Sequence, residues 1–398
     1  MSDDENYQKT QNITGAINLI RLIGDGKVLY VFFDYPVKAY KCKNKYTLTI
    51  DQFFTREFDK MKRSNNKIIY DFYLERTLSN VQTSERVDKS YLEDLSNKMA
   101  SYMKFDKKGM EISHIGENLR IHLIDVRDNI IQFLKSRMDS ILHFISVDNF
   151  QAAIQEFPVV LNCISALKTI LAQKTELRNK PSKFIDMLQK ARTDQGISEV
   201  EANEYLIKII NKLYGDYKSD IVKKPILGQM KKLIVEMENV SLNVKDIFDK
   251  IYNLNKSINS DSYKKKSLDG RIMYGIPCAT YQTEKAAFYH ELENWIYNVS
   301  VVGNRIMNLY FIRRFLDKSY ATNGIFYGNA WSACDIVHQL VKNYGFKVTH
   351  FSHSTILDIS ELNNSINKTD DVNLVCDIFY PFNLAQCVHL ENFPANFM

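Results

Sequence analysis

The spacing of hydrophobic positions changes twice along the chain. The first region alternates short apolar runs, typical of buried strands, with amphipathic helical stretches. The runs cover 28–33, 67–74 and 119–126, and the helical stretches include 49–62 and 129–144. This alternation predicts a layered α/β arrangement.

The middle of the chain has almost no strand signal. From Phe150 to about Ile258, apolar residues recur at helical spacing, as in Leu161, Ile164, Leu167 and Leu171. We therefore predict an antiparallel helical insertion, with helix starts or breaks at Pro158, Pro181 and Pro225.

The α/β pattern returns after a polar linker at 259–267. A long helix over about 283–316 precedes predicted strands near 325–328, 347–351 and 373–378. The amphipathic stretch from Asp335 to Tyr344, followed by Gly345, predicts a helix that ends at a glycine cap.

Together these patterns predict an α/β fold, with a mostly parallel sheet flanked by helices. Both ends of the chain contribute to this sheet, and the insertion between them is all helical. The predicted parts are a flexible N-terminal tail (1–18), a first α/β part (19–148), the helical insertion with its linker (149–267) and a second α/β part (268–398).

The amino-acid composition and net charge limit the classes of protein to which this chain can belong. With 398 residues, 45% of them hydrophobic and 25% charged, the chain has the make-up of a soluble globular protein. A net charge of +5 does not indicate a nucleic-acid partner, and the run Lys264-Lys265-Lys266 is typical of a solvated loop. The segment Gly24-Asp25-Gly26-Lys27 lacks the length of a phosphate-binding loop, so we predict a turn there.

Targeting signals and metal motifs are not evident in the sequence. The acidic N-terminus lacks the features of a secretory signal, and we expect no membrane span because no apolar stretch approaches about 18 residues. The six cysteines form no C-x-x-C pair, which predicts reduced thiols in a cytosolic protein. No cofactor is expected.

Two distant stretches carry the candidate chemistry. One runs from Val28 to Pro36 and ends at Asp34, and the other runs from Ile325 to Trp331 and ends at Asn329. Each has the pattern of a buried strand followed by a polar turn. In α/β folds, ligands bind at the carboxyl ends of such strands.

These stretches resemble the superfamily of the TIKI proteases, ChaN-like haem-associated proteins and erythromycin esterases, with its G-E-x-H and G-x-x-H motifs. The chain is still more similar to a branch of uncharacterised proteins of large nucleocytoplasmic DNA viruses. Further matches to that branch include Cys42, the strand 67–75, the stretch 120–127, the helix 308–313 and the ending 386–390. The resemblance leaves open that Cys42 and Cys387 approach each other in an oxidising setting.

Both histidines that the resemblance implies are missing, because Pro36 and Trp331 stand in their places. Neither residue can act as a metal ligand or proton shuttle as imidazole does. We therefore expect a vestigial site, in which Trp331 fills the former pocket. Its residues are Asp34, Pro36, Asp71, Glu75, Asn329 and Trp331, with Cys42, His122, Asp125, Arg127 and Arg313 as secondary candidates.

Two of these groups have alternative interpretations. Asp71 and Glu75 share a strand face and could hold a cation, but burial of Asp71 against an arginine is favoured. Strand alternation places His122 and Asp125 on opposite faces and predicts a structural ion pair between Asp125 and Arg127.

The expected function is that of a non-catalytic binding or structural protein of a large DNA virus. Its partners would be proteins, either a second copy or other viral proteins, in the host cytoplasm or the virion. The alternative is a divergent metal-dependent hydrolase, with Asp34, Asp71 and Glu75 as metal ligands beside Asn329.

Overall fold

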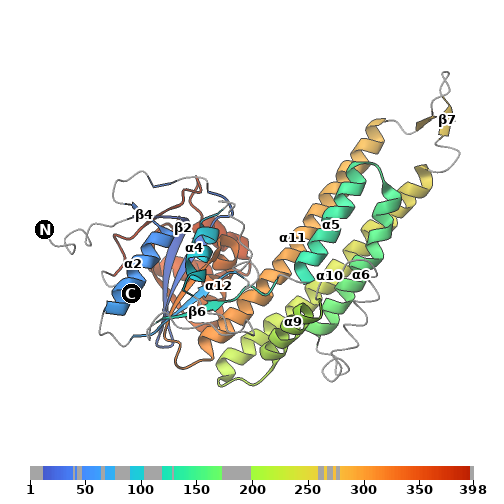
Figure 1. Ribbon diagram of the computed structural model, residues 1–398. Helices are drawn as coiled ribbons and strands as arrows, with labels where there is room; N and C mark the ends of the chain where they lie inside the picture. Colours follow the sequence, from blue (N-terminus) through green and yellow to red (C-terminus); the bar gives the residue numbers. More distant parts are fainter. Residues whose placement is uncertain are drawn as a thin grey trace. The chain divides into compact units, whose positions relative to one another are not determined.

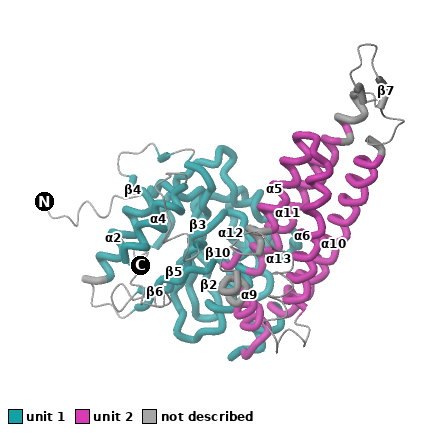
Figure 2. The backbone as a smooth tube through the Cα atoms, turned by 45° about the vertical axis from the view of Figure 1, so that its right-hand side comes forward, with its two compact units in different colours: residues 1–125, 217–225, 307–398 teal, residues 126–216, 226–306 magenta. Residues whose placement is uncertain are grey.

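A computed structural model gives the positions of most of the chain. It describes residues 12–38, 41–42, 47–63, 68–76, 90–102, 119–127, 130–172, 199–258, 264–266, 272–274 and 278–394. The chain divides into two compact units (Figure 2). Unit 1 comprises 1–125, 217–225 and 307–398, and unit 2 comprises 126–216 and 226–306.

A six-stranded sheet forms the centre of unit 1, in the order β10-β2-β3-β9-β5-β6 (Figure 1). The last four strands in this order run parallel, whereas β2 is antiparallel to both β3 and β10. Their bounds are β2 Ala16–Gly24, β3 Lys27–Asp34, β5 Tyr70–Leu74, β6 Leu119–Leu123, β9 Asn323–Asn329 and β10 Lys347–Phe351. The prediction of a mostly parallel sheet built from both chain ends is confirmed, because β9 lies between β3 and β5.

Helices cover both faces of this sheet. On one face, α2 (Ile50–Arg63) and α4 (Tyr91–Ala100) pack in one hydrophobic cluster with Phe32 and Phe72. On the other face, Phe33 contacts Phe379 of α14 (Val372–Phe379), and Phe326 contacts Phe311 of α11 (Cys278–Leu316). Strand alternation sends Phe32 and Phe33 to opposite layers, which explains why the run 28–33 is apolar throughout.

The helix after β9 follows the sequence pattern closely. It is α12 (Ala330–Tyr344), and Gly345 ends it in the left-handed conformation with φ of 67°. The predicted glycine cap is therefore confirmed. The predicted turn at Gly24–Lys27 is also confirmed, since it joins β2 to β3 as a hairpin.

The predicted strand at 373–378 is wrong, because these residues form α14. Asp371 caps this helix by accepting a hydrogen bond from the Asn373 backbone N–H at 2.8 Å. A short apolar run suits a buried helix as well as a strand, and periodicity alone does not separate the two. The helix α13 (Ile359–Lys368) precedes α14.

The predicted flexible tail is wrong from residue 12 onward. Residues 12–14 form β1 (Asn12–Thr14), and the buried strand β2 begins at Ala16. β1 lies between β4 (Thr47–Thr49) and β11 (Cys387–His389) in a small sheet. Residues 1–11 lie outside the described part of the chain.

Cys42 and Cys387 form a disulfide beside this small sheet, across 345 residues of sequence. The expectation of reduced thiols is therefore wrong for these two residues. Pairing of β1 with β11 places Cys387 opposite Thr14, whose hydroxyl accepts a hydrogen bond from the Cys42 N–H at 3.1 Å. Cys163, Cys334 and Cys376 are buried.

Unit 2 is an up-down-up-down helical bundle made of α5, α6, α10 and most of α11 (Figure 1). Pairs of side-chain contacts show that α10 runs antiparallel to both α6 and α11. They are Gln151 with Asn255 and Lys168 with Glu238, then Glu236 with Arg305 and Lys250 with Glu291. The bounds are α5 Ile130–Ser146, α6 Phe150–Leu171 and α10 Asp220–Ile258. A further helix, α9 (Glu199–Tyr214), contacts α6 through the Tyr214 hydroxyl.

Heptad spacing explains this bundle. The buried residues of its long helices are separated by alternating steps of three and four, which is the pattern of left-handed helix packing. They include Phe150, Ala153, Phe157, Val160, Ile164, Leu167 and Leu171 in α6, Met230, Leu233, Met237, Val240 and Val244 in α10, and Phe288, Leu292, Trp295, Val299 and Val302 in α11. A short hairpin of β7 (Lys264–Lys266) and β8 (Ile272–Tyr274) connects α10 to α11 in sequence.

Three expectations about the helical region need correction. The helical unit begins at Val126 and ends at Ile306, rather than spanning 149–267, because α5 and α11 pack with the bundle. Pro158 and Pro225 lie inside α6 and α10 and break neither helix, and Pro181 lies outside the described residues. From the sequence we expect no apolar stretch long enough to span a membrane, but α6 is long and apolar enough by composition. Core helices of soluble proteins share this property.

Candidate functional site

The carboxyl ends of β3 and β9 form a topological switch point. The chain leaves β3 toward α2 on one face of the sheet, whereas it leaves β9 directly into α12, which packs on β2, β3 and β9. Adjacent parallel strands whose helices lie on opposite faces leave a crevice where α/β proteins bind ligands. Asp34 and Asn329 are paired in register at these two strand ends, as the sequence predicted.

Glu75 joins this site from the end of β5. One of its carboxylate oxygens, Oε2, accepts a hydrogen bond from the Asn329 N–H at 2.8 Å. The Asn329 side chain in turn caps α12 by accepting the Trp331 N–H at 2.9 Å. A helix N-terminus is a favourable place for an anion, and here Glu75 supplies that negative charge from within the protein.

Gly328 makes this approach of Glu75 to the helix N-terminus feasible. A Cβ atom at position 328 would lie 2.3 Å from Glu75 Oε2, far inside van der Waals contact. The glycine is therefore required by the neighbouring carboxylate rather than by a left-handed backbone. Sequence reasoning did not assign this role, although Gly328 stands within the second motif stretch.

Asp34 has a different set of partners on the other side of the sheet. Its Oδ1 accepts a hydrogen bond from the Tyr327 hydroxyl at 2.9 Å, and that hydroxyl also lies 3.2 Å from the Gly15 carbonyl oxygen. Asp34 is only 2% exposed. Burial raises the pKa of Asp34 well above its usual value and the charge of Glu75 raises it further, while the Tyr327 hydrogen bond opposes the shift.

The two residues at the expected histidine positions differ in burial. Pro36 is exposed in the loop after β3, and Trp331 is half-buried in the first turn of α12. The Trp331 indole Nε1 is buried and has no hydrogen-bond acceptor among the described residues. Part of the indole is therefore enclosed, although its ring is not fully removed from solvent.

Asp71 does not belong to the switch-point site. It pairs in register with Arg120 of β6 and Gly324 of β9, whereas Glu75 lies beyond the carboxyl end of β5. The predicted metal set of Asp34, Asp71 and Glu75 is therefore wrong. Among the described residues, no group of three or more His, Cys, Asp or Glu side chains is arranged to hold a metal ion.

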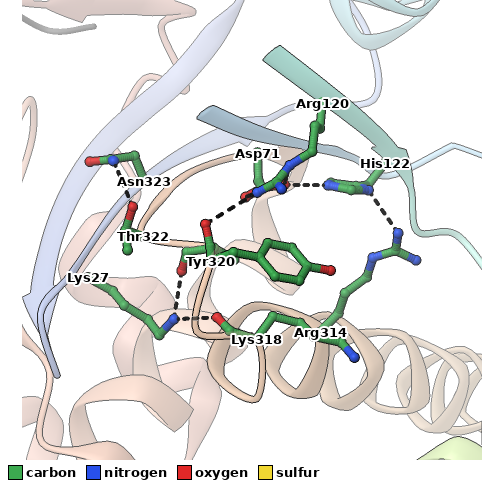
Figure 3. Close-up of polar contacts among 10 residues, drawn as sticks. Lys27, Asp71, Arg120, His122, Arg314, Lys318, Tyr320, Thr322 and Asn323 are labelled. Atoms are coloured by element: carbon green, nitrogen blue, oxygen red, sulfur yellow. Dashed lines mark hydrogen bonds and ion pairs between the residues drawn. The ribbon is translucent and has the colours of Figure 1, made fainter. Parts of the chain in front are cut away.

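Asp71 instead forms the centre of a second polar cluster on the α11 face (Figure 3). Arg120 donates to both of its carboxylate oxygens, and His122 Nε2 lies 2.7 Å from Oδ1. On the far side of the imidazole, Arg314 Nη2 lies 2.9 Å from His122 Nδ1. The favoured interpretation, burial of Asp71 against an arginine, is confirmed.

Cys42, Arg127 and Arg313 make contacts outside both clusters, whereas the Asp125 backbone N–H donates to the Arg76 carbonyl oxygen next to Glu75. Cys42 is held in the disulfide, so its sulfur is neither a thiolate ligand nor a nucleophile. Arg127 donates to Asn304 Oδ1, and Arg313 stacks on Tyr217 with 4.6 Å from its guanidinium carbon to the ring centroid. The strand β6 ends at Leu123, so the alternation argument for Asp125 does not apply.

The chain belongs to a family described as "Family of unknown function (DUF5847)", whose model matches residues 11–398. Among its relatives are uncharacterized proteins R706, R161 and R160 of Acanthamoeba polyphaga mimivirus. R706 is 26% identical, with 97% of this chain and 96% of the relative covered. R161 and R160 are each 24% identical, covering 97% and 98% of this chain and 98% of each relative. No solved structure matches.

Proposed function

We propose that the protein is a non-catalytic binding or structural protein of a large DNA virus, derived from the superfamily of TIKI proteases, ChaN-like proteins and erythromycin esterases. The observation that carries this proposal is the Glu75–Asn329 hydrogen bond at the switch point. Where a ligand would normally meet the helix N-terminus, a side chain of the protein itself is bound. The site is then a structural junction among β3, β5, β9 and α12.

The neighbouring acidic group supports the same conclusion. Asp34 is buried, and burial raises its pKa well above its usual value, which disfavours the ionised carboxylate, while the Tyr327 hydroxyl donates a hydrogen bond to Oδ1. Divalent cations bind ionised carboxylates, so an environment that disfavours ionisation makes Asp34 a poor metal ligand. The residues Pro36 and Trp331 supply no replacement for the two histidines that the superfamily resemblance implies.

A protein that acts by contact needs a surface for its partner, and α13 and α14 provide a candidate. Leu357, Leu374 and Phe382 are 78%, 53% and 106% exposed, respectively. The hydrogen bond from Thr355 N–H to the Ile378 carbonyl brings the segment around Leu357 to the end of α14. Exposed carboxylates lie nearby in the sequence, at Asp358, Glu361 and Asp377.

This acidic and apolar surface fits a protein segment that combines basic and apolar side chains. The partner would be a second copy or another viral protein. The Cys42–Cys387 disulfide favours the virion over the reducing host cytoplasm as the place where the protein acts.

The first experiment separates this proposal from the alternative, a divergent metal-dependent hydrolase. Purified full-length protein is assayed for bound metal and for hydrolysis of peptide and ester substrates, alongside Asp34→Asn and Cys42→Ala. We expect no stoichiometric transition metal and no turnover. Near-stoichiometric metal that is lost in Asp34→Asn, or turnover that this variant abolishes, would establish the hydrolase.

The second experiment tests, in infected cells, whether a partner protein binds the surface around α13 and α14. The variant Leu374→Asp/Phe382→Asp is compared with the control Leu242→Asp, which alters an exposed position on α10 that is 60% accessible. We expect the α13–α14 variant to lose cross-links to its partner and incorporation into virus particles, while the control keeps both. Equal incorporation of the two variants would refute the role of this surface.

A further inference from the structure

The cluster around Asp71 contains more positive than negative charge. Arg120 and Arg314 flank His122 and Asp71, and Lys27 acts electrostatically on the same carboxylate. Among the described residues, Asp71 is the one carboxylate that forms an ion pair with an arginine of this cluster, and Lys27 also interacts electrostatically with Asp25. We propose that this cluster binds a small oxyanion, of the phosphate or carboxylate class, through Arg314 and Arg120.

The carboxylate of Asp71 is already fully engaged. Arg120 Nε donates to Oδ1 at 2.7 Å and Arg120 Nη2 donates to Oδ2, while His122 donates to Oδ1 as well. The Asp71 side chain is 1% exposed. Burial alone would raise the pKa of Asp71, but the hydrogen bonds from His122 and Arg120 hold it below its usual value. This negative charge is therefore neutralised by Arg120.

Hydrogen-bond geometry assigns the proton on His122. A guanidinium has donors and no acceptor, so Nδ1 of His122 must accept from Arg314 Nη2. The ring proton is then on Nε2, where it is donated to Asp71. His122 is a neutral imidazole in this arrangement and contributes no charge to balance either arginine.

Arg314 is consequently a cation without an anion. Both of its hydrogen-bond partners among the described residues are neutral: Nη1 donates to the Tyr310 hydroxyl at 3.2 Å, and Nη2 donates to His122 Nδ1. No Asp or Glu oxygen among the described residues forms an ion pair with Arg314. Arg314 is half-buried and has no counter-ion among the described residues, so its positive charge is not compensated. A planar guanidinium binds carboxylate and phosphate groups through paired hydrogen bonds.

The turn that contains Lys318 and Ala321 lies at the edge of the cluster. Lys27 Nζ donates to the carbonyl oxygens of Lys318 and Ala321 at 2.9 and 2.6 Å, which positions the turn between them (Figure 3). On this turn, the Tyr320 ring lies 4.5 Å from the Arg120 guanidinium carbon and is 56% exposed. The Arg120 side chain is 18% exposed and Arg314 is partly exposed, so both arginines lie at the edge of the buried cluster.

This site is distinct from the switch point. Asp71 is level with Gly324 in β9, near the amino end of that strand, whereas Glu75 and Asn329 lie at the carboxyl ends. Anion binding here therefore does not depend on the proposed loss of catalysis, and the two proposals succeed or fail separately.

Calorimetric titration of full-length protein with phosphate, sulfate and acetate, against a chloride control, measures the affinity for each anion. We expect saturable binding with a dissociation constant of about 1 mM or below for at least one oxyanion. Arg314→Gln should weaken that binding at least about ten-fold. Arg313→Gln, which removes the same charge one position earlier on α11, should leave it within about two-fold.

A spectroscopic measurement covers the case in which Arg314→Gln fails to fold. The anion should shift the NMR resonances of the His122 ring, because Arg314 contacts its Nδ1, and Arg314→Lys should retain weakened binding. Equal affinity in wild type and Arg314→Gln would overturn the proposal. So would the absence of saturable binding for all three oxyanions, or binding that leaves the His122 resonances unchanged.

Discussion

Glu75 and Asn329 are 254 residues apart in the sequence, yet the Glu75 carboxylate accepts the Asn329 backbone N–H at 2.8 Å. The contact joins the end of β5 to the start of α12. It places a carboxylate at the positive end of the helix, where its charge stabilises the helix.

Replacement of Glu75 should destabilise the protein, and the loss should be larger when the new side chain has no oxygen to accept the Asn329 N–H. Glu75→Ala leaves a buried N–H without its acceptor and should cost about 1–3 kcal/mol of unfolding free energy. Glu75→Gln retains an oxygen at this position and should cost less. Urea unfolding of both variants measures the difference, and equal losses would indicate that the hydrogen bond contributes nothing.

Asp34 should make the protein less stable as the pH rises. Burial raises the folded-state pKa of Asp34 well above the unfolded value of about 3.9, so the folded protein binds more protons between these two values. Its unfolding free energy therefore falls from about pH 4 upward through the folded pKa. Asp34→Asn should gain stability relative to wild type across this range, as measured by unfolding from pH 4 to 8. Exposed Asp377 offers a matched Asp→Asn control, and a parallel profile for Asp34→Asn and wild type would contradict the prediction.

Trp331 should contribute through its volume and not through its indole N–H. Since the ring is half-buried, Trp331→Ala should cost about 2 kcal/mol, below the range for fully buried tryptophan. Trp331→Phe removes a buried donor that lacks an acceptor among the described residues, which offsets much of the lost volume. We expect Trp331→Phe to cost less than about 1 kcal/mol. Thermal unfolding measures both variants, and a loss under about 1 kcal/mol for Trp331→Ala would mean that the indole fills no pocket.

The disulfide should stabilise the protein against unfolding. The double variant Cys42→Ser/Cys387→Ser frees a long closed loop and should lower the unfolding free energy by about 2–5 kcal/mol. Wild type treated with a reductant should show the same loss, whereas the double variant should be insensitive to it. An unchanged midpoint for reduced wild type would show that the crosslink does not constrain the unfolded chain.

The sequence determined the features that depend on local periodicity. The apolar run before Asp34 and the repeat of the helical region each specify an element and its buried face, because those patterns follow from strand and helix geometry alone. Gly345 marked the end of α12 for the same reason, since a glycine there can adopt φ of 67° without strain. The polar strand ends at Asp34 and Asn329 were likewise evident, as was their meeting at one edge of a parallel sheet.

Tertiary structure decided which distant groups meet. The sequence placed Asp71 and Glu75 on one strand face, but strand register puts Arg120 beside Asp71 and the α12 terminus beside Glu75. The sequence also left open whether Cys42 lies next to Cys387, and the pairing of β1 with β11 decided this. The run 373–378 became a helix because Asp371 caps it and its apolar side packs on α12. Partners so far apart in the chain are selected by the packing of the whole sheet, and no local pattern encodes that selection.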